Sequence, residues 1–365
     1  MKALNPRDLR EMYSLLGCAY SITIDVLPSR TRGSSTPQTR PIRSPRGARN
    51  GPPFGFNLSL VSDNKSDQSP ATKIHRIAVL GAGTMGPGIA QVAAAAGFDV
   101  VMRDINAEAV ARGVQAIERN LEKGVQRGKI TEHELRETLQ RVRGTVALED
   151  IREVDLVIEP APENLDLKKI LLRETESTVN RDFIFATNTS SLSISEIASA
   201  SRRPGNVVGM HFFNPVPIMK LLEIVVGKET SKDTEATALE VARRMKKEPI
   251  VVRDAPGFAS SRLGVTLGLE AMRMLEQGVA SARDIDTAME LGYNHPVGPL
   301  RLTDLVGLDV RLNIAEYLHG ALGSETFRPP EILRRMVREG KLGKKSGEGF
   351  YKWNELEPAQ RAYTI

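Results

Sequence analysis

The chain has 365 residues, 41% of them apolar, and a formal net charge of +5 at pH 7. This length suggests two domains with substantial cores, and no apolar run approaches the length of a membrane span. The net charge comes entirely from residues 1–70, which hold ten Lys and Arg and five acidic residues, while the remainder holds 40 of each, so a basic nucleic-acid-binding surface is not indicated.

Residues 1–72 differ in composition from the rest and are interpreted as a leader. Positions 26–62 contain no acidic residue and are dense in Arg, Ser, Pro and Gly, a composition that buries too little apolar surface to order itself. Two interpretations remain open: a transit-like targeting peptide for the mitochondrial matrix, or a disordered or incidental extension of a cytoplasmic protein. The single cysteine, Cys18, lies here, which excludes thiol and disulfide chemistry from the body of the chain.

From residue 73 the sequence alternates short apolar runs with helical patterns, as βαβ units do. Predicted strands are 75–80, 98–103, 154–159, 183–187, 207–210, 221–226 and 250–253. Predicted helices are 87–96, 107–127 with Asn106 as its cap, a helix after the capping-box pair Thr131 and Glu134, and 194–200. Residues 73–254 are therefore expected to form an α/β domain of the Rossmann type, with a doubly wound, mostly parallel sheet.

After Pro256 and Gly257 the apolar spacing becomes helical, and no strong strand pattern remains. Helical stretches are predicted from residue 263 and over 282–291, 300–318 and 330–339. Residues 255–353 are therefore expected to form an all-helical C-terminal domain, with 354–365 as a tail.

A glycine-rich turn follows the first predicted strand and matches the pattern G-x-G-x-x-G. The motif alone is weak, but here it follows a strand, opens a helix and precedes an acidic residue, Asp104, at the end of the next strand. Such a turn brings backbone N–H groups and a helix N-terminus close to a diphosphate. The predicted dinucleotide-binding residues are Gly81, Ala82, Gly83, Thr84, Met85 and Gly86.

Asp104 bears on which dinucleotide this turn binds. Its carboxylate would accept hydrogen bonds from the ribose 2′-hydroxyl and repel a 2′-phosphate, which favours NAD over NADP. The adjacent Arg103 leaves NADP open. FAD shares the fingerprint, and a glycine turn without a ligand is the structural alternative.

The segment 206–226 places a histidine and a glutamate at the edges of two predicted buried strands. His211 follows the apolar run 207–210, and Glu223 lies inside the run 221–226. Burying a charge is costly unless the charge is paired, and a His–Glu pair would relieve that cost. Pairing would also orient the imidazole and make it more basic, as a general base requires.

A polar turn, 187–192, follows the predicted strand 183–187. Polar residues at the carboxyl end of a parallel strand lie where open α/β sheets bind ligands. The alternative is a local one, in which a Ser or Thr caps the helix 194–200. The clustering of these residues upstream of His211 favours a ligand-binding turn.

Five motifs occur in order along the chain: GAGTMG, NTSSL, HFFNPVPIMKLLEIV, DAPGF and GKKSGEGFYKW. In this order they resemble the L-3-hydroxyacyl-CoA dehydrogenase family, and most closely its stand-alone 3-hydroxybutyryl-CoA dehydrogenases. The resemblance covers about residues 73–353. It implies reversible, NAD-dependent oxidation of (S)-3-hydroxyacyl-CoA to 3-oxoacyl-CoA, with short chains such as 3-hydroxybutyryl-CoA favoured, in fatty-acid β-oxidation or butanoate metabolism.

The resemblance also implies roles for the site residues. His211 matches the general base that takes the proton of the substrate 3-hydroxyl, and Glu223 matches the acid that pairs with it. Ser190 matches the serine that bonds the substrate near the reacting oxygen. Asn214 matches an asparagine close to the acyl group and the nicotinamide.

Further positions match cofactor contacts of the family. Asn188 lies on the same turn as Ser190. Glu163 and Lys168 match positions near the nicotinamide end of the cofactor. Lys345 matches a tail lysine that reaches back to the cofactor.

The helix 107–127 matches one that lies along the CoA moiety. Asn120 and Arg127 fall at its CoA-contacting positions, and Lys123 is a neighbouring candidate for a phosphate. Ser261 is a departure, because many relatives carry an asparagine there. It remains a candidate substrate contact, and it puts the acyl-chain preference in doubt.

Two other functions are weighed against this one: a dehydrogenase of a free hydroxy acid or sugar acid, and a catalytically silent NAD-binding protein. Retention of both His211 and Glu223 argues against a silent protein. No two histidines are spaced as metal ligands, so no metal is expected. The helical domain is expected to form a homodimer, with no nucleic-acid or membrane partner.

Overall fold

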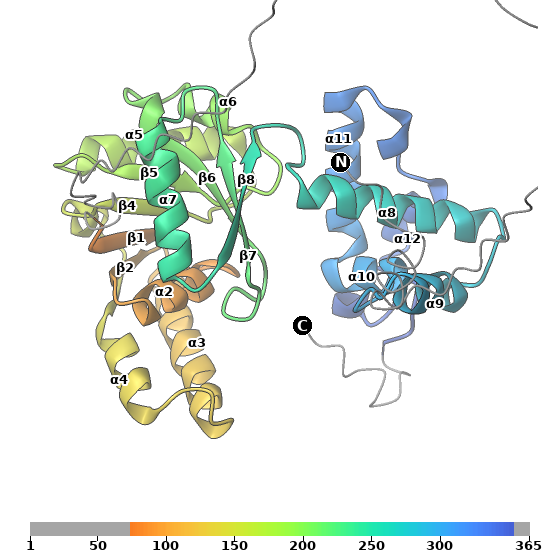
Figure 1. Ribbon diagram of the computed structural model, residues 1–365, viewed down its shortest axis with the longest axis horizontal. Coiled ribbons are helices and arrows are strands. Elements are labelled where there is room, and N and C mark those ends of the chain that lie inside the picture. The colour runs from red at the N-terminus through yellow and green to blue at the C-terminus, as the bar shows by residue number, and fades with distance from the viewer. Residues whose placement is uncertain (1–73, 354–365) are drawn as a thin grey trace, which may run out of the picture. The chain divides into compact units, whose positions relative to one another are not determined.

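The computed structural model describes residues 74–353; the predicted leader, 1–72 with Cys18, and the predicted tail, 354–365, lie outside the described residues. An eight-stranded sheet with flanking helices is followed along the chain by a group of helices (Figure 1). This confirms the predicted fold class. Within residues 74–353, no helix is long and apolar enough to cross a membrane.

The strands of the sheet are arranged in the order β3-β2-β1-β4-β5-β6-β7-β8. All neighbours run parallel except β6 and β7, which are antiparallel. Each predicted strand is present, and β3 is an edge strand that the sequence patterns did not indicate. The bounds are β1 Arg76–Leu80, β2 Asp99–Arg103, β3 Val142–Thr145, β4 Leu156–Glu159, β5 Ile184–Thr187, β6 Val207–Phe212, β7 Leu221–Val226 and β8 Glu248–Arg253.

Six helices accompany the strands. The two predicted N-terminal caps are confirmed: Asn106 accepts hydrogen bonds from Glu108 N and Ala109 N at the start of α3, and Thr131 and Glu134 form a capping box on α4. The prediction missed α5 and α7. The bounds are α2 Gly86–Ala95, α3 Ala107–Gln126, α4 Glu132–Gln140, α5 Leu165–Thr178, α6 Ile194–Ala198 and α7 Lys232–Arg244.

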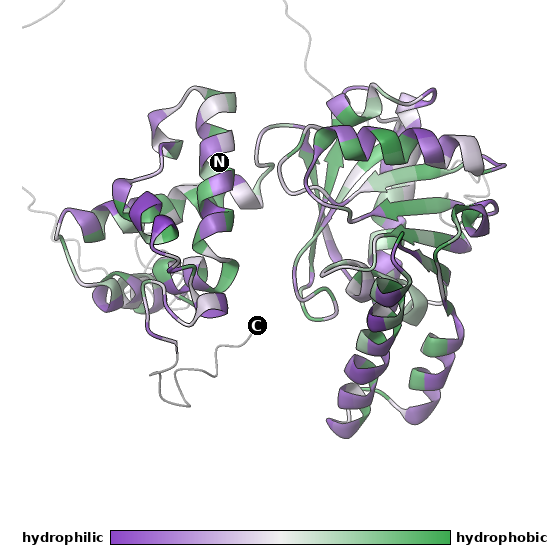
Figure 2. Ribbon diagram, turned by 180° about the vertical axis from the view of Figure 1, so that it is seen from behind, coloured by the Kyte–Doolittle hydropathy of each residue, from purple (hydrophilic) through white to green (hydrophobic). Residues whose placement is uncertain are grey.

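The central strands of the sheet are buried on both faces, as is usual for parallel strands covered by helices. Alternate residues of β1 enter opposite cores: Ile77 packs in the cluster that contains residues of α2 and α7, and Ala78 in the cluster that contains residues of α5 and α6. Figure 2 shows the strands as largely hydrophobic and the helices with hydrophilic faces. Because β1, β2, β4 and β5 run parallel, their carboxyl ends meet at one edge of the sheet.

Helices α8 to α12 share their own apolar core, which includes Val265, Leu269, Leu300, Leu318 and Leu333. The helix expected over 300–318 is divided into two, because Gly307 between them adopts φ +104°. The bounds are α8 Ser260–Glu276, α9 Ala282–Gly292, α10 Pro299–Val306, α11 Leu308–Leu322 and α12 Glu331–Arg338.

Candidate active site

The glycine loop joins β1 to α2 with geometry that only glycine permits at two positions. Gly81 has φ +131°, and a Cβ on Gly86 would lie 1.8 Å from the Gly81 carbonyl oxygen. A Cβ on Gly83 would meet nothing within 4 Å, so its backbone borders open space. No side chain caps the N-terminus of α2, which leaves its first N–H groups to a diphosphate.

Asp104 follows β2 and holds the glycine loop directly. Its Oδ2 accepts a hydrogen bond of 2.8 Å from Ala82 N, and its Oδ1 accepts one of 3.1 Å from Asn106 N. The neighbouring Arg103 directs Nε to the Val146 carbonyl, 3.3 Å away. The carboxylate of Asp104, and not the guanidinium of Arg103, therefore lies at the loop, and this acceptor fits the ribose hydroxyls of NAD.

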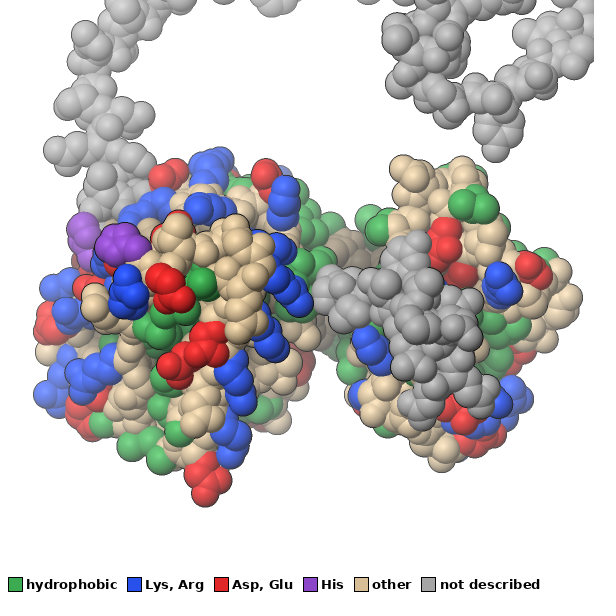
Figure 3. All heavy atoms as spheres, turned by 90° about the horizontal axis from the view of Figure 1, so that it is seen from below, with side chains coloured by type: hydrophobic (Ala, Val, Ile, Leu, Met, Phe, Trp, Pro, Cys, Tyr) green, Lys and Arg blue, Asp and Glu red, His purple; other side chains and the backbone are tan. Residues whose placement is uncertain are grey.

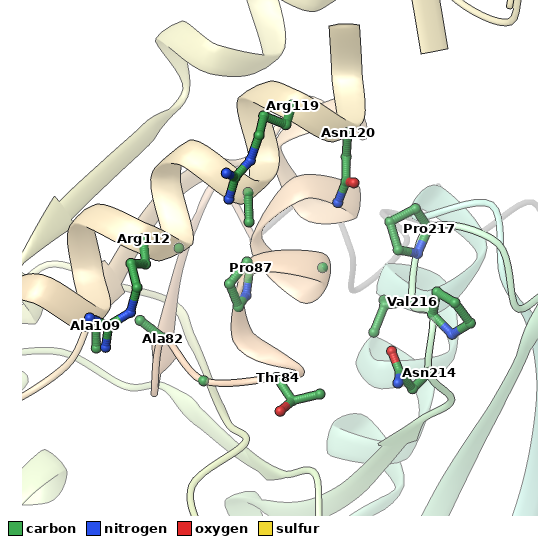
Figure 4. Close-up of a pocket in the computed structure, with 15 residues that line it drawn as sticks. Ala82, Thr84, Pro87, Ala109, Arg112, Arg119, Asn120, Asn214, Val216 and Pro217 are labelled. Atoms are coloured by element: carbon green, nitrogen blue, oxygen red, sulfur yellow. The ribbon is translucent and has the colours of Figure 1, made fainter. Parts of the chain in front are cut away.

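A cavity of about 450 Å³ extends from the glycine loop along one face of α3 (Figure 4). The loop after β6, including Asn214, forms the opposite wall, and Asn120 from α3 also lines the cavity. Arg112 and Arg119 contribute two cationic side chains that the motif comparison missed. The lining residues are Ala82, Gly83, Thr84, Pro87, Gly88, Ala109, Arg112, Gly113, Ala116, Arg119, Asn120, Asn214, Pro215, Val216 and Pro217.

Lys123 and Arg127 do not line this cavity. Lys123 lies in the last turn of α3, and Arg127 is the C-cap residue that ends the helix. In Figure 3 Lys and Arg side chains gather along one edge of the sheet part. The helical spacing of Arg112 and Arg119, seven residues apart, could have revealed that both share one face of α3.

His211 and Glu223 are brought together by the antiparallel pairing of β6 and β7. The two residues lie opposite each other in the ladder, and His211 Nδ1 is 2.6 Å from Glu223 Oε2. His211 is buried, and Glu223 is completely inaccessible. Among the described residues, His211 Nε2 has no hydrogen-bond partner, so this nitrogen is the one available to a substrate.

Glu223 is itself held by the start of α8. Ala259 N and Ser260 N donate to its Oε1 over 3.2 and 2.9 Å, and Ser260 Oγ donates to its Oε2 over 2.7 Å. Burial alone would raise the pKa of Glu223, but the hydrogen bonds from His211 and Ser260 outweigh it and hold the pKa below its usual value. The carboxylate therefore stays charged beside the imidazole.

Two aromatic rings flank the imidazole of His211. The ring centroid of Phe213 lies 4.5 Å away and that of Phe258 lies 5.9 Å away. At the end of β6, the side chain of Asn188 accepts a 2.8 Å hydrogen bond from Phe212 N. The two rings pack against the imidazole, and Asn188 uses its side-chain oxygen to hold the end of β6.

Glu163 organises the serine turn after β5. Its Oε1 accepts hydrogen bonds from Ser190 N and Ser191 N, both 3.0 Å, and from Thr189 Oγ1 at 2.6 Å. Ser190 Oγ lies 3.3 Å from the same oxygen. The predicted nicotinamide-end contact at Glu163 therefore coincides with a structural role that sets the position of Ser190.

Lys168 is fully buried inside α5. Its Nζ donates to Glu159 Oε1 over 2.8 Å and to the Ala161 carbonyl over 3.1 Å, while Thr187 Oγ1 donates to the other oxygen of Glu159. These bonds occupy the ammonium group of Lys168, and its contact with the cofactor stays a prediction. Through the Ala161 carbonyl, Lys168 also secures the loop that carries Glu163.

Lys247, at the start of β8, supports the loop after β6 from behind. It is 7% exposed, and its Nζ donates to the Val216 carbonyl and, over 2.7 Å, to the Met219 carbonyl. Burial lowers the pKa of this amine. No sequence motif marks Lys247, because its role depends on packing against a distant loop that includes Asn214.

Two predicted residues belong to the helical part. Ser261 Oγ lies 3.4 Å from the Ser190 carbonyl, so α8 brings it to the serine turn. Lys345 Nζ bonds both carboxylate oxygens of Asp309 over 2.6 Å; its contact with a cofactor stays a prediction. Across residues 74–353, no group of three His, Cys, Asp or Glu side chains could hold a metal ion.

Comparison with known proteins agrees along nearly the whole described chain. Residues 76–255 match the family model of the 3-hydroxyacyl-CoA dehydrogenase NAD binding domain, and residues 257–353 match that of the C-terminal domain. A probable 3-hydroxybutyryl-CoA dehydrogenase of Bacillus subtilis is 44% identical over 78% of this chain and 99% of its own. A 3-hydroxybutyryl-CoA dehydrogenase of Clostridioides difficile is 42% identical over 77% of this chain and 100% of its own.

Solved structures show the same likeness. The crystal structure of (S)-3-hydroxybutyryl-CoA dehydrogenase from Ralstonia eutropha superposes with a TM-score of 0.75 at 41% identity. It covers 77% of this chain and 99% of that one. The share of this chain without a counterpart is comparable to the leader and the tail.

Proposed function

Since the chain belongs to the 3-hydroxyacyl-CoA dehydrogenase family, we propose that it oxidises (S)-3-hydroxyacyl-CoA to 3-oxoacyl-CoA with NAD, reversibly. Short-chain substrates such as 3-hydroxybutyryl-CoA are favoured, as the names of the relatives suggest. The observation that carries the proposal is the buried pair of His211 and Glu223, 2.6 Å apart, beside the serine turn.

Proton transfer is assigned to His211. Its Nε2 takes the proton of the substrate 3-hydroxyl while the C3–H bond breaks and the C3–O bond becomes a carbonyl. NAD, when bound, accepts the hydride that leaves C3. The imidazolium that forms is stabilised by the carboxylate of Glu223, whose own hydrogen bonds from Ser260 keep it charged and oriented. In the reverse direction the imidazolium returns the proton to the oxygen.

Substrate orientation is assigned to the serine turn and the loop after β6. Ser190, set by Glu163, would hydrogen-bond the reacting oxygen and so align C3. Asn214, which lines the cavity, would contact the acyl group and the nicotinamide. Asn188, Ser261 and Lys345 are proposed to act at the edges of this site, Asn188 by fixing β6.

The cavity along α3 suits the anionic parts of the ligands. Arg112, Arg119 and Asn120 line it, and arginine suits phosphate groups because its guanidinium presents two parallel donors. We assign Arg112, near the glycine loop, to the diphosphate end, and Arg119 with Asn120 to CoA. Lys123 and Arg127 remain candidates for the outer phosphate of CoA.

Physiological context is also part of the proposal. We place the enzyme in fatty-acid or butanoate metabolism and in the cytoplasm; the mitochondrial alternative depends on residues 1–72. A homodimer through the helical part is expected, because Leu263, Leu291 and Tyr293 expose 71%, 82% and 74% of their surface there, and apolar surface of this kind favours association. Sedimentation velocity at micromolar concentration would test it; a monomer would contradict it.

An initial-rate assay tests the function. Acetoacetyl-CoA, 3-oxodecanoyl-CoA and free acetoacetate are each offered with NADH and with NADPH. We expect reduction of acetoacetyl-CoA with NADH to be fastest. Equal rates with free acetoacetate would favour the dehydrogenase of a free hydroxy acid, and NAD binding without turnover of any substrate would favour the silent protein.

A further inference from the structure

Arg311 occupies a core position of α11 yet has no anionic partner. The buried face of this helix consists of Leu308, Arg311, Ala315 and Leu318, the spacing of a single helix face. Arg311 is only 7% exposed, and its Nε is enclosed without a hydrogen-bond partner. Within the part of the chain that the structure describes, its guanidinium forms no hydrogen bond or ion pair.

Enclosing Nε of a cation without an acceptor is unfavourable, because this N–H loses its water and gains no partner. Burial lowers the pKa of Arg311 to about 10, which still leaves it charged at neutral pH. Lys168 and Lys247, the other buried cations among the described residues, both donate to oxygen acceptors. Arg311 alone lacks an acceptor, which points to an anion supplied from outside the chain.

The position of Arg311 relates it to the serine turn. A Cβ on Gly264 would lie 3.3 Å from Arg311 Nη1, and a Cβ on Gly257 would lie 2.8 Å from Leu318. Helix α11 therefore runs antiparallel along residues 257–264. Arg311 lies beside Gly264, roughly one helical turn, about 5 Å, beyond Ser261, whose Oγ is 3.4 Å from the Ser190 carbonyl.

We propose that Arg311 binds a carboxylate at the far end of the acyl chain, so that the enzyme accepts 3-hydroxyacyl-CoA esters of dicarboxylic acids. The inference rests on the proposed function, in which Ser190 contacts the reacting oxygen at the other end of the same chain. A planar guanidinium can hold a carboxylate through two parallel hydrogen bonds. In this proposal the acyl chain passes Ser261, whose side chain is short, on its way to Arg311.

A matched pair of substrates tests the role of the charge. 3-Hydroxyadipyl-CoA and 3-hydroxyhexanoyl-CoA have equal chain lengths and differ in a terminal carboxylate. The wild type should show the higher kcat/KM for the adipyl ester. Arg311→Met should lower that value by about 100-fold, as expected when a buried charged hydrogen bond is lost, and should change the hexanoyl value little. Arg311→Lys should fall between, because lysine keeps the charge without the fork.

The control variant is Arg335→Met, which removes an exposed positive charge from α12 of the same helical group; it should leave both substrates unchanged. Calorimetric titration with adipyl-CoA and hexanoyl-CoA, without NAD, repeats the comparison as binding alone. If Arg311→Met does not fold, the wild-type titration and the Arg311→Lys variant still test whether Arg311 binds the carboxylate. Tighter binding of hexanoyl-CoA than of adipyl-CoA by the wild type would overturn the proposal.

Two other outcomes would also overturn it. Equal adipyl-to-hexanoyl ratios in the wild type and in Arg311→Met would show that the cation does not contact the acyl end. Loss of a dimer in sedimentation of Arg311→Met would assign the guanidinium to a carboxylate of a second copy. A wild type inactive on acetoacetyl-CoA would instead contradict the proposed function, and the binding ratio would then decide for Arg311.

Discussion

His211 and Glu223 face each other across the antiparallel strands β6 and β7, with Nδ1 and Oε2 2.6 Å apart. The carboxylate also accepts from Ser260 at the start of α8. Nδ1 of the imidazole is thereby held by β7, which α8 in turn holds, and Nε2 is left for a substrate.

Replacing His211 with alanine should abolish hydride transfer without abolishing cofactor binding. General-base loss typically lowers kcat by about 10²- to 10⁴-fold, whereas the glycine loop and Asp104 are unaffected. Single-turnover rates and NADH fluorescence titration would measure the two effects. The control is His133→Ala on the exposed α4, which should have wild-type kinetics. Wild-type kcat in His211→Ala would sink the base assignment.

Replacing Glu223 with glutamine should destabilise the fold at neutral pH and much less in acid. The folded pKa lies below the usual 4.5, so the carboxylate stabilises the fold above that pH, and its contribution disappears as the pH falls through the lowered value. The neutral-pH cost should be about 2 kcal/mol. Urea unfolding from neutral pH to about pH 3 would measure it; a difference independent of pH would contradict the charge argument.

Replacing Asp104 with alanine should relax the preference for NAD. The carboxylate lies at the glycine loop through Ala82 N, where it would repel a 2′-phosphate. The ratio of kcat/KM for NAD to that for NADP should fall by about tenfold or more, equivalent to about 1.4 kcal/mol. Glu108→Ala, on exposed α3 nearby, is the control. An unchanged ratio in the Asp104 variant would remove the ribose contact from the proposal.

Breaking the buried pair of Lys168 and Glu159 should destabilise the protein strongly. Both side chains are fully buried and 2.8 Å apart, so either Lys168→Met or Glu159→Gln leaves an uncompensated buried group at a cost of about 3–5 kcal/mol. The double variant should cost less than the sum of the two. A denaturation double-mutant cycle would measure the coupling, and strict additivity would refute the pairing.

Replacing Lys247 with methionine should affect substrate binding more than the chemical step. The Val216 and Met219 carbonyls would lose their donor, and the loop that carries Asn214 would lose its support. KM for acyl-CoA should rise about tenfold, as loss of about 1.4 kcal/mol predicts, with kcat little changed. Lys246→Met is the control, because Lys246 is exposed. A fall in kcat alone would indicate another role.

The sequence predicted the strands that contain a run of apolar residues and missed the one strand among the described residues that lacks such a run. Strand β3 contains Arg143 and Gly144 and is only partly buried, so no apolar alternation marks it. Helix α5 buries Lys168, Thr175 and Glu176, and these polar residues conceal its periodicity. The break at Gly307 depends on a positive φ, which apolar spacing does not reveal.

The site residues also fall into two groups, those that a local motif marks and those whose surroundings depend on packing. Local motifs located the glycine loop, the serine turn and the His211–Glu223 segment, because each is contiguous and follows a strand. Glu163, Arg119 and Arg311 could not be assigned their surroundings from the sequence. Their environments arise from packing between elements. Arg311, for example, occupies a position where the helical spacing predicts an apolar residue, and its charge does not reveal that it is buried.

The antiparallel ladder between β6 and β7 allows the position of the catalytic base and the shape of the substrate cavity to change separately. The register of the ladder sets His211 opposite Glu223, whereas the side chains of the loop 213–220 do not contribute to that pairing. Side-chain substitutions in that loop would therefore reshape the wall of the cavity without displacing the base. The same chemical step can be kept while the acyl group that it serves is altered, so descendants of this scaffold can diverge in substrate while retaining their reaction.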